Sequence, residues 1–222
     1  MSREGTSELV ERLSQELRPV RRIPRLRQAA GGVALLWLGV GALALALRGL
    51  RPDLLQQLQP ASAFVVILMG LGLIAVGGVV AALATSVPGR EGAARVSLGL
   101  GLGGVMLAAL VGAILILREA GPAPLACPFE NDLACFTVAC LLALPPALGI
   151  LAFVSRGAPY RPLIAVLAAA TGAVALGALL VHVSCPESNP RHIILSHALA
   201  PLGGALLLTL PFRAALKRVT GI

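Results

Sequence analysis

The sequence predicts an all-α fold, a polytopic membrane bundle of six transmembrane helices with a short amphipathic segment before it. The first observation is composition: the 222 residues are 57% hydrophobic and 13% charged, with a mean hydropathy of +0.89, which lies far outside the range of soluble domains. The second is run length, because a helix needs about 20 apolar residues to cross ~30 Å of hydrocarbon. Six runs meet this length, at residues 29–47, 61–84, 96–117, 133–154, 163–183 and 193–212.

The third observation is that no Asp, Glu, Lys or Arg lies inside these six runs. Proton-coupled transporters and ion pumps commonly place ionisable groups at mid-membrane, so their absence disfavours transport. The first run is too long for the apolar region of a signal peptide and follows an unusually long leader, so we interpret it as a retained span. The chain then divides into an N-terminal segment (1–28), a transmembrane domain (29–212) and a C-terminal tail (213–222).

Basic residues indicate how the bundle is oriented. Fourteen of the 18 Lys and Arg residues lie in the two terminal segments or in the loops after the second and fourth runs, which all face one side of the membrane. The other four lie in the loops on the opposite side: Arg48, Arg51, Arg118 and Arg191. Positively charged loops stay in the cytoplasm. Both termini are therefore expected in the cytoplasm, and the protein is expected to contact the bilayer and not nucleic acid.

The N-terminal segment combines an apolar stripe with a dense basic stretch. Leu9, Leu13 and Leu17 follow one another at four-residue spacing, which predicts one apolar face of a short helix ending before Pro19. Four arginines follow or overlap its end: Arg18, Arg21, Arg22 and Arg25. Prolines keep this stretch extended. It can anchor the chain at anionic headgroups, or it can bind an acidic partner while the leucines occupy a groove.

Glycines in the spans predict close helix packing. Gly99, Gly101 and Gly104 formally match a nucleotide-binding GxGxxG pattern, but the βαβ context is missing and the segment is a span. We instead predict that Gly99 and Gly103, at four-residue spacing, allow a neighbouring helix to approach. The same role is expected of Gly70, Gly77 and Gly78.

Cysteines and histidines gather near the outer face and are the best candidates for chemistry. One alternative is a disulfide, with Cys135 to Cys185 as the first pairing and Cys127 to Cys185 as the second. The other is a metal site made by His182, Cys185, His192 and one further cysteine. His197 is expected to form an interhelical hydrogen bond. No cofactor other than such a metal ion is expected.

Several stretches resemble the NrsF-like anti-sigma factors of the bacterial inner membrane. They are "LVERLSQELRPVRRIPRLR", "LPPALGILAFVSRGAPYRPLIAVLAAATGAVALGAL" and "HVSCPE". The resemblance implies a non-enzymatic regulator of stress transcription that sequesters an extracytoplasmic-function sigma factor and releases it on an envelope signal. Its partner-binding residues would be Leu9, Leu13, Leu17, Arg18, Arg21, Arg22 and Arg25.

Two other functions stay open at this point. A membrane thiol/quinone oxidoreductase would use a reactive cysteine pair, although the sequence has no CxxC motif. A small-molecule transporter would bind its solute between the spans. Neither the signal nor the oligomeric state follows from the sequence.

Overall fold

The computed structural model describes residues 3–15, 24–60, 62–118, 129–157 and 159–220, and all regular structure in these ranges is helical. The elements are α1 (Arg3–Gln15), α2 (Leu26–Arg48), α3 (Leu54–Gln57), α4 (Ala63–Ala84), α5 (Glu91–Arg118), α6 (Phe129–Val154), α7 (Pro162–Ser184), α8 (Pro190–His192), the π-helix η1 (Ile193–Ala198) and α9 (Ala200–Thr220).

Among the described residues, six helical stretches are long and apolar enough to span a membrane, which confirms the predicted fold class. Five of them are α2, α4, α5, α6 and α7, and the sixth runs through α8, η1 and α9 from Pro190 to Arg218. The ends differ from the predicted runs by a few residues. The largest differences are at α5, which begins at Glu91, and at α9, whose helix continues through most of the predicted tail to Thr220.

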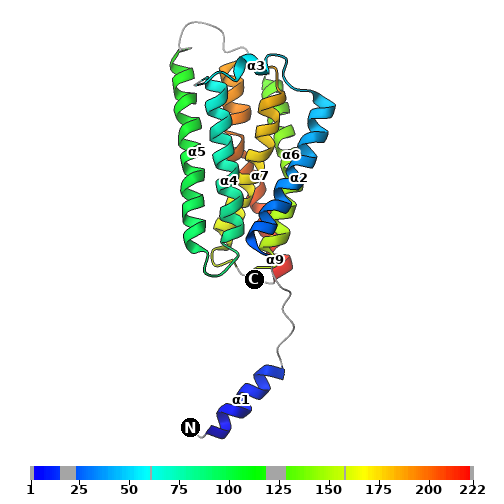
Figure 1. Ribbon diagram of the computed structural model, residues 1–222, viewed down its shortest axis with the longest axis vertical. Helices are drawn as coiled ribbons and strands as arrows, with labels where there is room; N and C mark the ends of the chain where they lie inside the picture. The colour runs from blue at the N-terminus through cyan, green and yellow to red at the C-terminus, as the bar shows by residue number, and fades with distance from the viewer. Residues whose placement is uncertain (1–2, 16–23, 61, 119–128, 158, 221–222) are drawn as a thin grey trace.

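Helix α7 forms the centre of the bundle (Figure 1). It packs against α4, α6 and α9, while α5 lies outside α4 and α2 lies mainly against α6. In the most apolar window of each helix, 72% of α7 is buried but only 17% of α2 and of α5. Helix α2 begins and α9 ends at the same end of the bundle, and the short helix α3 lies at the opposite end (Figure 1).

Glycines bring α4 into close contact with both of its main neighbours. A Cβ atom on Gly77 would lie 2.5 Å from the backbone nitrogen of Gly101 in α5, and one on Gly78 would lie 2.7 Å from the Cα of Gly172 in α7. The prediction for Gly99 and Gly103 was wrong, because nothing lies within 4 Å of a Cβ at either position. Four-residue spacing identifies a helix face but not which neighbour that face meets.

Local signals explain the helix ends at the α3 end of the bundle. Gly49 ends α2 with a φ of 78°, a left-handed value that glycine adopts without strain. Ser62 begins α4, since its hydroxyl accepts a hydrogen bond from the backbone N–H of Val65. Asn189 begins α8 in the same way by accepting from the N–H of Arg191 at 2.9 Å.

Candidate thiol and metal centre

Three segments bring cysteines and histidines together at the α3 end of the bundle. The first turns of α6 carry Asp132 and Cys135, and the end of α7 carries His182 and Cys185. The chain then turns through residues 186–189 into α8 and η1, which supply His192 and His197. The centre therefore joins the fourth, fifth and sixth spans.

The π-helix explains why two of these histidines lie on one side of the sixth span. A π-helix closes i to i+5 hydrogen bonds, as the Leu199 N–H does to the Ile194 carbonyl at 2.9 Å. Residues five apart then lie nearly above one another, and the ring centroids of His192 and His197 are 5.2 Å apart. In a regular α-helix, this spacing would direct the two rings to different faces.

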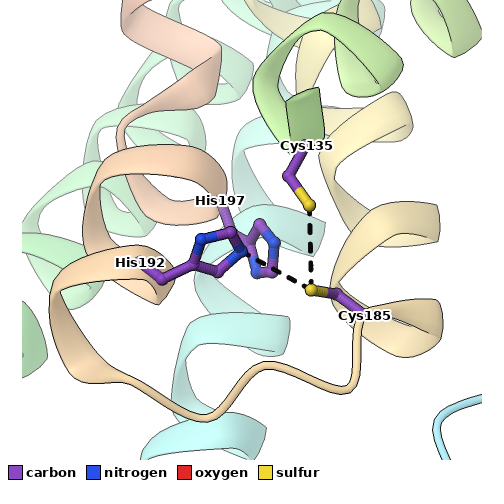
Figure 2. Close-up of side chains that lie close together, drawn as sticks. All are labelled: Cys135, Cys185, His192 and His197. Carbon is purple, nitrogen blue, oxygen red and sulfur yellow. Dashed lines mark hydrogen bonds between the residues drawn. The ribbon is translucent and has the colours of Figure 1, made fainter. Parts of the chain in front are cut away.

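Four side chains converge in a buried cluster (Figure 2). The Sγ atoms of Cys135 and Cys185 are 3.7 Å apart, and Cys185 Sγ lies 3.5 Å from Nε2 of His192. One ligand atom from each of Cys135, Cys185, His192 and His197 falls within 4.8 Å of all the others. All four residues are buried, and the described cysteines carry free thiols.

Hydrogen bonds behind the two histidines fix which nitrogen faces the sulfurs. His192 Nδ1 lies 2.7 Å from Oδ1 of Asp132, so a neutral His192 donates there and keeps its lone pair on Nε2. His182 Nε2 lies 3.2 Å from the carbonyl oxygen of Phe64, which can only accept, so the other nitrogen of a neutral His182 accepts from Nδ1 of His197 at 3.0 Å. His197 then also keeps its lone pair on Nε2.

Nε2 of His197 is buried and has no hydrogen-bond partner among the described residues. Leaving a buried polar atom unpaired costs about 1–3 kcal/mol, so such an atom is a candidate ligand. Once deprotonated, the two cysteines and the two imidazole nitrogens, which are held by second partners, would make a donor set that suits zinc or another soft, tetrahedral ion. The same 3.7 Å between sulfurs also brings the two thiols within reach of a disulfide.

The thiol of Cys185 lies just beyond the end of α7, outside the spans. It shares an S–H···S hydrogen bond with Cys135, and with Cys135 as the donor this contact lowers the pKa of Cys185 below its ordinary value, against the opposing effect of burial. A thiolate is the form that binds metals and attacks disulfides. Both proposed chemistries of the centre therefore begin at Cys185.

A family model described as negative regulator of sigma F matches residues 13–216. The chain belongs to the NrsF family. Comparisons with curated proteins and with solved structures give no match. Membership implies that the chain negatively regulates a sigma factor, which makes a sigma factor its expected partner.

The structure places the predicted outer-face residues of this NrsF-family protein in two groups. Cys135, Cys185 and His192 belong to the four-residue cluster. His182 stands behind it, with both ring nitrogens bonded to His197 and Phe64. Cys127 lies outside the described residues.

The predicted partner-binding residues are described only in part. Leu9 and Leu13 are exposed on α1, and Arg25 is exposed at the start of α2. The remaining four residues, Leu17, Arg18, Arg21 and Arg22, lie outside the described residues.

Asp132 and Arg51 were not predicted as site residues. Asp132 precedes the predicted start of the fourth span, but α6 begins at Phe129, so Asp132 is helical and buried. It lies three residues before Cys135, a spacing that puts both on one helix face. The spacing could have identified Asp132 as a neighbour of Cys135, but only with the start of α6 placed before Asp132.

Proposed function

We propose that this NrsF-family chain is an inner-membrane anti-sigma factor whose N-terminal segment holds an extracytoplasmic-function sigma factor in the cytoplasm. The observation that supports the proposal best is the exposure of Val10, Leu9 and Leu13 on α1, at 61%, 55% and 54%. An isolated helix of 13 residues is marginal in water, so such a stripe calls for a partner. The arginines that follow α1 suit acidic side chains, because guanidinium groups bind carboxylates in pairs of hydrogen bonds.

The sigma factor is released when the thiol and metal centre changes. Disulfide formation or metal binding at Cys135 and Cys185 alters how the fourth to sixth spans pack, and the N-terminal segment binds the sigma factor in one packing state only. A ligand shifts a conformational equilibrium by its difference in affinity for the two states. A tenfold fall in sigma affinity needs about 1.4 kcal/mol of such difference.

Co-purification of the sigma factor with the full-length protein tests whether the N-terminal segment binds it. We expect Leu9→Ala with Leu13→Ala, and separately Arg21→Ala with Arg22→Ala, to recover much less sigma factor than the wild type. The matched control is Arg213→Ala with Lys217→Ala, which removes two exposed basic residues of α9 from the same predicted side. Equal recovery from all four proteins would contradict the proposal.

A thiol/quinone oxidoreductase is the second candidate, and the short distance between the Cys135 and Cys185 sulfurs favours it. Such an enzyme would lose quinone-dependent thiol oxidation on Cys135→Ala and would not need the N-terminal segment. Deleting residues 1–17 therefore distinguishes the two functions, because the deletion would abolish sigma-factor binding but not thiol oxidation.

A further inference from the structure

Arg51 is a buried charged residue beside the centre, in the segment that links α2 to α3. Its side chain is 2% exposed and forms a two-point ion pair with Asp53, at 2.7 Å from Nε and 2.9 Å from Nη2. Removing a guanidinium from water is costly unless its hydrogen bonds are satisfied. Orientation in the membrane needs only an exposed charge, so the burial of Arg51 calls for another explanation.

Two further hydrogen bonds of Arg51 reach the segment that carries the centre. Its backbone N–H donates to the Val183 carbonyl at 3.1 Å, between His182 and Cys185. Its Nη2 donates to the Ser188 hydroxyl at 3.0 Å, in the turn that leads from Cys185 to His192.

Phe64 adds a third connection between Arg51 and the centre. The guanidinium carbon of Arg51 lies 5.2 Å from the centroid of the Phe64 ring. The same ring stacks on His182, with the ring centroids 4.3 Å apart and an angle of 15° between the planes. Arg51 therefore touches the backbone, the turn and the aromatic contact that support Cys185, His182 and His192.

Helix α2 is loosely packed: it lies mainly against α6, and it also contacts one stripe of α7. Only Val33, Gly41 and Ala44 are buried in α2. The indole N–H of Trp37 donates to the Leu176 carbonyl at 2.9 Å, and Gly41 faces the side chain of Leu180. These two contacts and the hydrogen bond from Arg51 to Val183 involve positions 176, 180 and 183, which lie on one face of α7.

We infer that Arg51 is the positioning residue that couples the thiol and metal centre to α2, the span that continues into the N-terminal segment. Closing the 3.7 Å gap between the Cys135 and Cys185 sulfurs to the ~2 Å of a disulfide must displace at least one of the two cysteines. Val183 and Ser188 flank Cys185 and carry the displacement to Arg51. The loose packing of α2 lets it respond as a unit, and this inference rests on the proposed function only for the step from α2 to the sigma factor.

Trp37 is the only tryptophan of the chain and reports directly on the contact between α2 and α7. We would record its emission in full-length protein in lipid nanodiscs before and after diamide. Each pair of thiols forms one S–S bond and gives two protons and two electrons to the azo group of diamide. The wild type should show a change in Trp37 emission, and Cys135→Ser should show none.

The deciding variants are Arg51→Ala and Arg51→Lys, which remove the two-point contact to Asp53 while leaving both cysteines in place. We expect both to lose most of the emission change while maleimide labelling shows the same loss of free thiols as in the wild type. Arg118→Ala, which removes an exposed arginine at the same end of the bundle, should respond like the wild type. An unchanged response in Arg51→Ala would overturn the inference, as would a wild type whose Trp37 emission does not respond.

Sigma recovery from the same samples separates the two proposals. A wild type that responds through Trp37 but never binds the sigma factor refutes the proposed function and leaves the coupling intact. A wild type that releases the sigma factor, together with an Arg51→Ala protein that releases it equally, refutes the coupling alone.

Discussion

Nδ1 of His192 lies 2.7 Å from Oδ1 of Asp132, although 60 positions separate the two residues in the sequence. The carboxylate holds the imidazole so that Nε2 faces the sulfur of Cys185. A second partner of this kind orients a ligating histidine and raises its basicity. Both residues are buried, so the contact also ties the start of α6 to the sixth span.

Asp132→Asn tests whether this contact serves a metal ion. We expect the affinity for Cd²⁺ to fall by about 10- to 100-fold, the usual effect of losing such a partner. The measurement is a titration of the full-length protein, followed by the ultraviolet absorbance of the thiolate–metal bonds. Glu91→Gln, which removes an exposed carboxylate at the opposite end of the bundle, should bind like the wild type. Equal affinity in Asp132→Asn would show that Asp132 does not support a metal ligand.

The disulfide alternative has its own test. Mild oxidation should remove two hydrogen atoms from the wild type, detected as a mass difference in the peptides that contain Cys135 and Cys185. The two sulfur atoms are 3.7 Å apart, so they can form the bond once one of the two cysteines shifts. Cys140→Ser should oxidise in the same way, since Cys140 lies more than a turn further along α6. Linkage of Cys185 to Cys127 instead would contradict this pairing.

The sequence predicted most of the fold, because bilayer thickness sets the length of the apolar runs. The orientation indicated by the basic residues stays a prediction. The sequence also predicted that Cys135, Cys185 and His192 belong to one group. The predicted interhelical hydrogen bond of His197 is confirmed, since its Nδ1 lies 3.0 Å from Nδ1 of His182 in α7. The place of His197 beside His192 could not be predicted, because the π-helix that aligns the two residues leaves no simple periodicity. Arg51 was assigned to the outer loop by charge alone, and its burial depends on contacts with α4 and α7.

The glycine contacts predict a difference between two substitutions in adjacent helices. Gly77→Ala in α4 should destabilise the bundle by about 1–3 kcal/mol, because the new methyl group would meet backbone atoms of α5 that cannot rotate away. Gly99→Ala in α5 should be neutral or slightly stabilising, since open space surrounds that position. Thermal unfolding of the two purified proteins in one detergent measures the difference. Equal midpoints would contradict the close packing of α4 on α5.

The ion pair of Arg51 and Asp53 predicts how stability depends on pH. Hydrogen bonds from Arg51, and then from Gln57, hold the pKa of Asp53 well below its usual range. A group with a depressed folded pKa stabilises the protein above its unfolded pKa of about 3.9 and loses that contribution as pH falls through the folded value.

Asp53→Asn should therefore lower the unfolding midpoint by a constant amount between pH 8 and pH 5. The difference from the wild type should shrink only at about pH 4 and below, where the unfolded carboxylate takes up a proton. The measurement is thermal unfolding of both proteins across this pH range. Glu91→Gln is the control, because it removes an exposed carboxylate far from Arg51. A difference that already shrinks between pH 8 and pH 6 would mean that Asp53 does not hold Arg51 as a charged pair.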